Sequence, residues 1–270
     1  MINPEFDSIK GEKIIDYINQ LFCMDNLEFM KQLPDKCIDL IYSDILYNTG
    51  KKFKDFDDNL GTPQEAIQWY EPRLIEMKRV LKDTGSIYLQ CDYRLVHYLK
   101  VEMDNIFGIH NFQNDIVWCY NGGGISKKRF NRKHDNILFY TKSNKFVFNT
   151  QYQPYNKNSA KRLLNKHRGK DKSNRINIGT PMIDWWTDIK CIVNPENVEY
   201  TDYNTQKPEA LLERIIKASS NEGDIVADFF CGSGTTCVVA KELHRYYIGC
   251  DTNSRAIKLT RERLNNEIHN

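Results

Sequence analysis

The sequence of 270 residues lacks the features of secreted, membrane and zinc-binding proteins. No apolar run approaches the roughly 18 residues that a membrane-spanning helix needs. The N-terminus shows no basic segment followed by an apolar stretch, which argues against a secretory signal. The eight cysteines form no CxxC pair and no regular framework, a pattern typical of reduced thiols in a cytosolic protein rather than of disulfides or zinc ligands. We therefore expect a cytoplasmic protein without a metal site.

An excess of charge of one sign is also missing. The sequence has 38 Lys and Arg against 36 Asp and Glu, so the formal net charge is only +2. With 27% charged and 40% hydrophobic residues, the composition is that of an ordinary folded domain and excludes a disordered chain. The length suits one large domain or one domain with an insertion.

Short apolar segments alternate with helical patterns, which predicts an α/β fold with a mostly parallel central sheet. We expect strands at 20–24, 37–43, 86–91, 114–120, 136–141, 224–230 and 246–251, and helices at 25–33, 62–85, 93–107, 208–220, 234–243 and 253–266. A polar stretch breaks this alternation, and its segment 157–175 holds eight Lys and Arg against one Asp. The sequence thus predicts a core formed by 1–145 and 202–270, an insertion at 146–201, and a basic loop at 121–134 beside the insertion.

A buried strand, two glycines and a helix follow one another near the C-terminus. Gly232 and Gly234 come directly after the strand, where glycine lets the backbone approach a ligand and the helix N-terminus offers free N–H groups. The next strand ends in Asp251, where a carboxylate could bind the ribose hydroxyls of an adenosine-type cofactor. The third glycine of a dinucleotide motif is absent. Adenosine without a pyrophosphate indicates S-adenosylmethionine.

The segment 228–236, DFFCGSGTT, resembles the FxGxG cofactor motif of amino-group DNA methyltransferases, although Phe229 stands where the family often has Pro. The order along the chain is similar to that of the permuted beta class: catalytic motif, basic target-recognition insertion, TQKP at 205–208, then FxGxG. The resemblance covers about 20 to 265 and implies a Rossmann-like S-adenosylmethionine-dependent methyltransferase fold. The residues that it implies for the cofactor are Asp25, Asp44, Lys207, Phe230, Gly232, Gly234, Thr235 and Asp251. Asp25 could equally be a helix cap, and Lys207 a solvated lysine at the start of a helix.

The catalytic motif of this family is Asp-Pro-Pro-Tyr, and this chain has Asp44-Ile-Leu-Tyr47 after a buried strand. An exocyclic amine on a base is a poor nucleophile because its lone pair is delocalised. A carboxylate that accepts one N–H, with a main-chain carbonyl that accepts the other, directs the lone pair toward the methyl group. We assign these roles to Asp44 and the carbonyl of Ile45, and base stacking to Tyr47.

The register of this motif favours adenine N6, because a start at Ser43, as in cytosine-N4 enzymes, would place Leu46 where the aromatic residue belongs. Cytosine-N4 methylation stays as the near alternative. Cytosine-C5 chemistry is excluded because no Pro-Cys pair occurs. The loss of both prolines leaves open a catalytically impaired, DNA-binding relative. A methyltransferase acting on RNA or protein is a further alternative, disfavoured by the motif order and the basic insertion.

Double-stranded DNA is the expected partner, because two basic clusters lie where the family has its target-recognition region. A possible cognate restriction endonuclease, a homodimer and an association with a bacterial nucleoid follow from the resemblance alone. An acidic patch, 55–58, is interpreted as a solvated loop beside the site. The residues expected to contact DNA are Lys127, Lys128, Arg129, Arg132, Lys133, Lys161, Arg162, Lys166 and Arg168.

Overall fold

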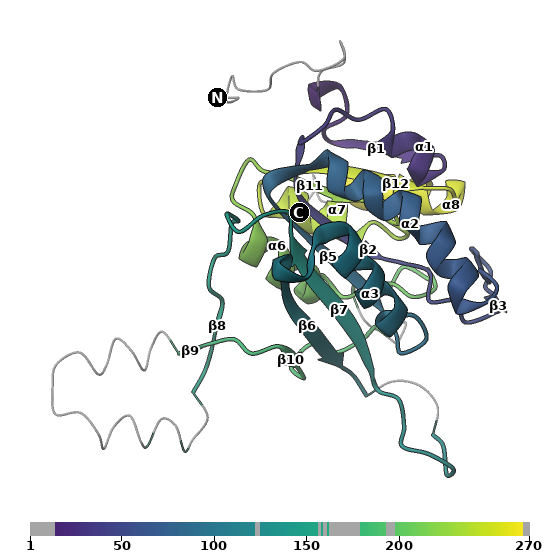
Figure 1. The fold of residues 1–270 in the computed structure, drawn as a ribbon, viewed down its shortest axis with the longest axis vertical. Coiled ribbons are helices and arrows are strands. Elements are labelled where there is room, and N and C mark those ends of the chain that lie inside the picture. The colour runs from purple at the N-terminus through teal and green to yellow at the C-terminus, as the bar shows by residue number, and fades with distance from the viewer. Residues whose placement is uncertain are drawn as a thin grey trace, which may run out of the picture.

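The structure, a computed structural model, describes residues 14–121, 125–155, 158, 161, 179–192 and 198–266 (Figure 1). Its centre is an eight-stranded sheet in which each strand is parallel to its neighbours except β7, which is antiparallel to the strands on both sides. Across the sheet the strands are β1 (Gln20–Cys23), β12 (Tyr246–Asp251), β11 (Ile225–Asp228), β2 (Ile38–Asp44), β5 (Leu81–Cys91), β7 (His134–Thr141), β6 (Phe112–Cys119) and β10 (Trp185–Trp186). The predicted α/β fold with a mostly parallel sheet is confirmed.

Helices cover both faces of this sheet, so its central strands are apolar on both sides. In β2, Ile41 packs with α1 (Asn26–Met30), α2 (Pro63–Val80) and α3 (Val96–Phe107), the last two seen in front of the sheet in Figure 1. Its neighbours Leu40 and Tyr42 face α6 (Glu209–Ser219) and α7 (Thr235–Glu242) on the other side. α8 (Ser254–Asn266) packs beside α7, β1 and β12. The short elements are η1 (Ile14–Asp16), η2 (Ile109–Asn111), and two small antiparallel pairs, β3 (Lys51–Lys52) with β4 (Asp57–Asp58) and β8 (Tyr152–Gln153) with β9 (Thr180–Pro181).

α2 begins as predicted and ends earlier than predicted. The Thr62 side chain accepts the Glu65 N–H and the Glu65 side chain accepts the Thr62 N–H, a capping box followed by Pro at the first helical position. The expected end at Gly85 is wrong, because the helix stops at Val80. The carbonyls of Arg79 and Val80 accept the N–H groups of the chain entering β2, and Leu81 is already extended and starts β5.

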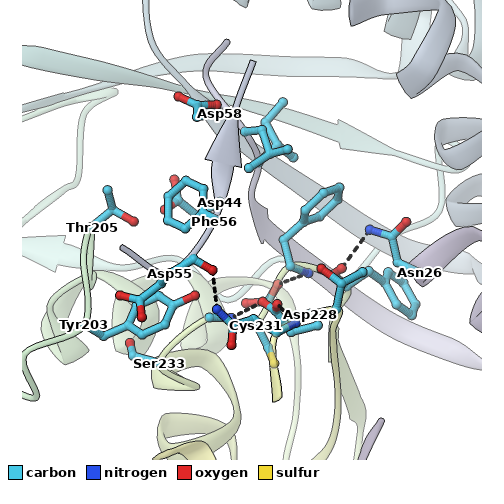
Figure 2. Close-up of a pocket in the computed structure, with 18 of the residues that line it drawn as sticks. Asn26, Asp44, Asp55, Phe56, Asp58, Tyr203, Thr205, Asp228, Cys231 and Ser233 are labelled. Atoms are coloured by element: carbon cyan, nitrogen blue, oxygen red, sulfur yellow. Dashed lines mark hydrogen bonds between the residues drawn. The ribbon is translucent and has the colours of Figure 1, made fainter. Parts of the chain in front are cut away.

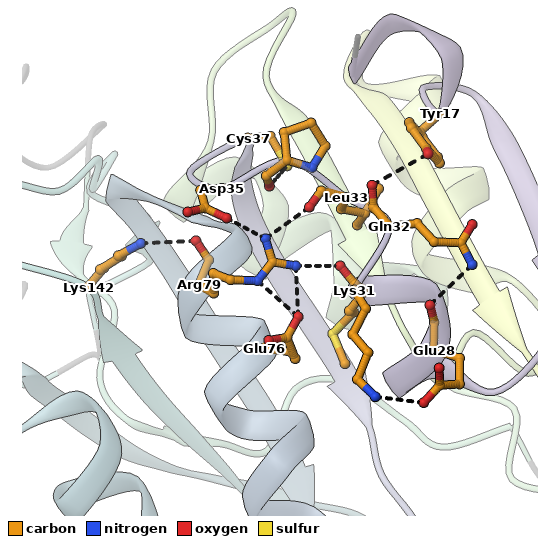
Figure 3. A network of polar contacts seen from close by, with 12 residues as sticks. Tyr17, Glu28, Lys31, Gln32, Leu33, Asp35, Cys37, Glu76, Arg79 and Lys142 are labelled. Carbon is orange, nitrogen blue, oxygen red and sulfur yellow. Dashed lines mark hydrogen bonds and ion pairs between the residues drawn. The ribbon is translucent and has the colours of Figure 1, made fainter. Parts of the chain in front are cut away.

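Arg79 fixes this junction between helix and sheet (Figure 3). Its guanidinium donates to the carbonyl of Leu33, 2.9 Å away, and binds the carboxylates of Asp35 and Glu76. Lys142, at the end of β7, donates to the Arg79 carbonyl across 3.3 Å. The last turn of α2 is thereby tied to the segment before β2 and to the end of β7, which fixes where β2 enters the sheet.

Part of the predicted insertion belongs to the main sheet. β10 pairs with β6, with Trp185 beside Val117. The Trp186 side chain is buried and donates from Nε1 to the Ile183 carbonyl at 2.8 Å, whereas Trp185 is 56% exposed. Only one of the two tryptophans therefore packs in the core. Most of 156–178 lies outside the described residues, so the boundaries of the insertion remain a prediction.

The chain reverses its direction of travel across the sheet between β2 and β11, which lie side by side. From β2 it passes through α2 to β5 on one side, and from β11 through α7 to β12 on the other. In open α/β sheets ligands bind outside the carboxyl ends of the strands at such a point. The fold therefore places a binding crevice at the ends of β2, β11 and β12.

Candidate active site

A cavity of about 430 Å³ opens at this point. Three strand ends contribute carboxylates to its lining: Asp44 from β2, Asp228 from β11 and Asp251 from β12. In Figure 2 the side chains of Asp44, Asp55 and Tyr203 lie on one side of the view, and that of Asp228 lies nearer the centre, beside Cys231. Two of the strand-end carboxylates, Asp44 and Asp251, were predicted from the sequence, and both line the same cavity.

The glycine loop after β11 forms the cavity floor, and two of its glycines have conformations that favour glycine. Gly232 has φ +48° and Gly234 has φ +78°. A Cβ on Gly234 would overlap the side chain of Thr260, and one on Gly232 would lie 3.1 Å from the Tyr203 ring. Asp251 accepts the Gly232 N–H at 2.9 Å and the Asn253 N–H at 2.8 Å. The carboxylate predicted to bind ribose thus also fixes the loop against β12.

Asp25 lies on another wall of the cavity and is the cap of α1. Its side chain accepts the Leu27 and Glu28 N–H groups and pairs with Arg73 at 2.7 Å. Arg73 also donates to Asn26, whose amide donates to the Phe229 carbonyl at 2.9 Å. The helix-cap interpretation is therefore confirmed, while the role of Asp25 toward a cofactor stays a prediction.

Both oxygens of the Asp44 carboxylate have partners in the cavity. The Tyr47 hydroxyl donates to Oδ1 at 2.7 Å, and the Lys207 ammonium contacts Oδ2. Burial raises the pKa of Asp44 above its ordinary value, and Lys207 and Tyr47 oppose that rise by stabilising the carboxylate. Lys207, one of the residues that the resemblance implies for the cofactor, pairs with Asp44, 163 residues earlier in the chain. The Asp44 carboxylate, which is expected to orient the amine, and the Lys207 cation therefore lie in the same site.

A second carboxylate, Asp135, also lies within hydrogen-bond distance of the Tyr47 hydroxyl, 3.0 Å away. Asp135 is 5% exposed and also accepts from Tyr120 and Gln90, each at 2.9 Å. It lies at the start of β7, and because β7 runs antiparallel, the start of this strand meets the ends of the others. Sequence reasoning missed Asp135, since no local pattern reveals the direction of β7.

The residues around Asp44 explain how the motif is held without its prolines. Ile45 is buried in the core that the sheet shares with α1 to α3, and Leu46 packs against the same core. The Tyr70 hydroxyl donates to the Leu46 carbonyl at 2.9 Å. Ser43 is 0% exposed, and its hydroxyl accepts the Phe229 N–H at 3.4 Å. Asp44, and not Ser43, is among the residues that line the cavity.

The segment 53–58 lines one side of the cavity and so lies beside the site, as predicted; Asp57 is exposed, but the prediction of solvation is wrong for Asp55 and Asp58. The Asp55 side chain is only 1% exposed and pairs with Arg255 of α8. Asp58 is 2% exposed and accepts the backbone N–H groups of Asn48 and Thr49 at 2.9 and 3.0 Å. These carboxylates face inward because their partners come from outside the segment, which a local charge pattern cannot show.

Asp228 is a further residue that sequence reasoning missed, although its place at the end of a strand before the glycine loop is a usable signal. It is 3% exposed and accepts from the Thr236 hydroxyl at 2.6 Å and the Phe230 N–H at 3.0 Å. Burial raises the pKa of Asp228 to about 7. Phe230 packs against Trp69 and Tyr70 with ring centroids 6.2 and 6.3 Å apart, which makes this wall apolar.

The residues predicted to contact DNA are placed only in part. Lys127, Lys128, Arg129 and Arg132 are exposed on the loop between β6 and β7, Lys133 is half-buried there, and Lys161 is exposed. Arg162, Lys166 and Arg168 lie outside the described residues.

Across the described part of the chain, no helix is long and apolar enough to cross a membrane.

Comparison with known proteins identifies the family. A family model described as DNA methylase matches residues 38–262. The chain belongs to this DNA methylase family. It is 35% identical over 260 residues to the Type II methyltransferase M.HpaI of Haemophilus parainfluenzae, covering 93% of this chain and 75% of that protein. It is 34% identical over 251 residues to the DNA adenine methyltransferase YhdJ of Escherichia coli (strain K12), covering 91% and 82%.

Two solved structures share the fold of this DNA methylase. The complex of M1.HpyAVI with SAM has a TM-score of 0.60 at 23% identity, covering 91% of this chain and 98% of that chain. The cytosine-N4-specific PvuII DNA methyltransferase has a TM-score of 0.65 at 16% identity, covering 90% and 85%. The predicted methyltransferase fold and the predicted membership of the amino-group DNA methyltransferases are confirmed.

The enzyme is an S-adenosylmethionine-dependent DNA methyltransferase, and its cavity fits this cofactor. The volume lies within the roughly 300–1,000 Å³ of small-molecule pockets. Gly232 lines the cavity beside Tyr203, and Gly234 lets the loop pack closely against Thr260. Phe230 and Trp69 offer an apolar wall for a nucleobase, and the Asp251 carboxylate lies beside the floor. The roles of individual residues toward the cofactor remain predictions.

Proposed function

We propose that this enzyme methylates N6 of adenine at a specific site in duplex DNA, with Asp44, the Ile45 carbonyl and Tyr47 as the groups that contact the base. The observation that carries the proposal is the placement of Asp44 on the cavity, with Ser43 buried and bonded to the strand beside it. This placement supports the motif register that starts at Asp44. The names of similar proteins, among them a DNA adenine methyltransferase, agree with adenine as the target.

The bound cofactor would supply an electrophilic methyl group on a sulfonium. Asp44 would accept one N–H of the adenine amine and the Ile45 carbonyl the other, which directs the nitrogen lone pair outward. Each carboxylate oxygen has two acceptor sites, so Asp44 can bind the amine while Tyr47 still donates to it. Tyr47 would stack on the flipped base, and its hydroxyl, held by Asp44 and Asp135, fixes the ring.

The buried side chain of Ile45 and the partly buried side chain of Leu46 support an active rather than an impaired enzyme. Proline would stiffen this loop through its ring, whereas here core packing and the bond from Tyr70 to the Leu46 carbonyl hold it. Because the base-binding group at this position is a main-chain carbonyl, the side chains need only keep the backbone in place.

The test is to incubate the enzyme with S-adenosylmethionine and unmethylated genomic DNA, and to analyse the nucleosides by mass spectrometry. We expect N6-methyladenine; N4-methylcytosine would overturn the choice of base. Asp44→Asn should lower the single-turnover rate about a hundredfold or more while calorimetry shows cofactor binding within a few-fold of wild type. The matched control is Asp83→Asn, an exposed carboxylate at the start of β5, far from the cavity. Full activity of Asp44→Asn would contradict the assignment.

Partners beyond DNA stay within the proposal. Several similar proteins carry the name Type II methyltransferase, as M.HpaI and M.HinfI do, which supports a restriction–modification system with a cognate endonuclease. We also propose a homodimer and a bacterial cytoplasmic, nucleoid-associated location, on the family resemblance alone. Sedimentation of the purified enzyme, with and without DNA, tests the oligomeric state.

A further inference from the structure

The loop between β6 and β7 exposes an apolar tip on a basic segment. Phe130 is 99% exposed and Ile125 is 86% exposed. No other aromatic side chain in the described ranges is as exposed, the next being Trp185 at 56%. Exposing a phenyl ring to water is unfavourable, so a fully exposed ring held on an ordered turn indicates a contact with another molecule.

The tip has a defined local structure. The Ser126 N–H donates to the Asn131 side chain at 2.6 Å, and the Lys128 N–H donates to the Ser126 hydroxyl at 3.2 Å. These bonds close the turn around 126–131 and leave the Phe130 ring outside it. In Figure 1 the described part of this loop extends away from the body of the domain, beyond the ends of β6 and β7.

The base of the loop is connected to the active site. Tyr120 donates its N–H to the Lys133 carbonyl and its hydroxyl to Asp135, each across 2.9 Å. Asp135 in turn holds Tyr47. The Arg132 guanidinium lies 3.5 Å from the centre of the Tyr93 ring, two residues after the end of β5. The loop therefore starts at the sheet edge where the base would enter.

Charge decides which molecule covers the tip. The segment 125–133 contains five Lys and Arg and no Asp or Glu. A second copy of the same face would bring like charges together, which disfavours a symmetric dimer through this loop. DNA phosphates complement these cations, and apolar side chains are known to insert between base steps.

We propose that Phe130 enters the base stack of duplex DNA and fills the space that the flipped target base leaves, while the neighbouring cations bind phosphates. This inference rests on the proposed function, since it requires that a base be flipped. It assigns Phe130 as a positioning residue for flipping. It also separates two roles within one loop: the ring stabilises the flipped state, and the lysines supply affinity that depends on salt.

The test compares Phe130→Ala, Phe130→Trp and Lys127→Ala with wild type. The control Val101→Ala removes an apolar side chain, 61% exposed, from α3. The substrate is an oligonucleotide carrying the methylated site found by sequencing genomic DNA treated with wild type. A second duplex has a mismatched partner opposite the target, so that flipping costs less. The readouts are kcat/KM, the fluorescence of 2-aminopurine at the target, and the salt dependence of DNA affinity.

Phe130→Ala should lower kcat/KM on the matched duplex about tenfold or more, and much less on the mismatched duplex. The rise in 2-aminopurine fluorescence on binding should be smaller for Phe130→Ala than for wild type, while the salt dependence of DNA affinity should be unchanged. Phe130→Trp should restore the rate, and Lys127→Ala should reduce the salt dependence instead. Wild-type rate and fluorescence in Phe130→Ala would overturn the inference. A wild type that methylates no adenine would instead overturn the proposed function.

Discussion

Asp228 should make the folded enzyme less stable as the pH rises toward neutrality. Its carboxyl is 3% exposed at the end of β11, and burial raises its pKa from an ordinary 3.8 to about 7. Between these two values the unfolded chain has released the proton and the folded chain still holds it, so the free energy of unfolding falls with pH. Above about 7 both states are ionised and this contribution becomes constant.

The pKa difference sets the size of the effect. A difference of about 3 pH units corresponds to about 4 kcal/mol, of which about 2 kcal/mol falls between pH 5 and pH 7. Asp228→Asn has nearly the same shape and no titrating proton. It should therefore remove this part of the pH dependence, and any hydrogen bond that it weakens to Thr236 or Phe230 shifts stability by the same amount at every pH.

The assay is urea unfolding of the cofactor-free wild type and variant, followed by far-ultraviolet circular dichroism between pH 5 and pH 8. The other buried carboxyls titrate in both proteins, so the difference between the two curves isolates Asp228. We expect that difference to change by a few kcal/mol in favour of the variant as the pH rises. Parallel curves would refute the reasoning, because they would mean that Asp228 is ionised in the folded state at pH 5.

Three further predictions test the surroundings of the site. Gly234→Ala should abolish cofactor binding in calorimetry and destabilise the fold by about 1–3 kcal/mol, because its Cβ would overlap Thr260. The control is Gly223→Ala: Gly223 also has a positive φ, but an added Cβ would meet no atom within 4 Å, so cofactor binding should stay intact. Equal losses in both variants would contradict the overlap. Thr62→Ala should cost about 1 kcal/mol in urea unfolding through loss of the α2 cap; an unchanged midpoint would argue against the cap. Asp135→Asn should lower the single-turnover rate about tenfold with unchanged cofactor affinity, since it weakens an acceptor of two tyrosine hydroxyls; a wild-type rate would show that Asp135 does not position the motif.

Local pattern was enough to place most of the elements. Strands and helices were predicted within a few residues because apolar periodicity and capping residues act over short distances. β12 was predicted at 246–251, as observed. The predicted end of α2 failed because contacts from the segment before β2, and not a local glycine, stop the helix.

The sequence by itself determined the family, the cofactor class and the two strand-end carboxylates, Asp44 and Asp251. These rest on short motifs and on their order, which need no knowledge of distant contacts. Only the tertiary structure decided that Lys207 pairs with Asp44, that Asp135 anchors Tyr47, and that the segment of Asp55 faces inward. Each of these contacts joins residues from different elements, and the antiparallel direction of β7 brings its first residues to the edge where the other strands end. Such pairings depend on strand order and direction, which only the assembled sheet specifies.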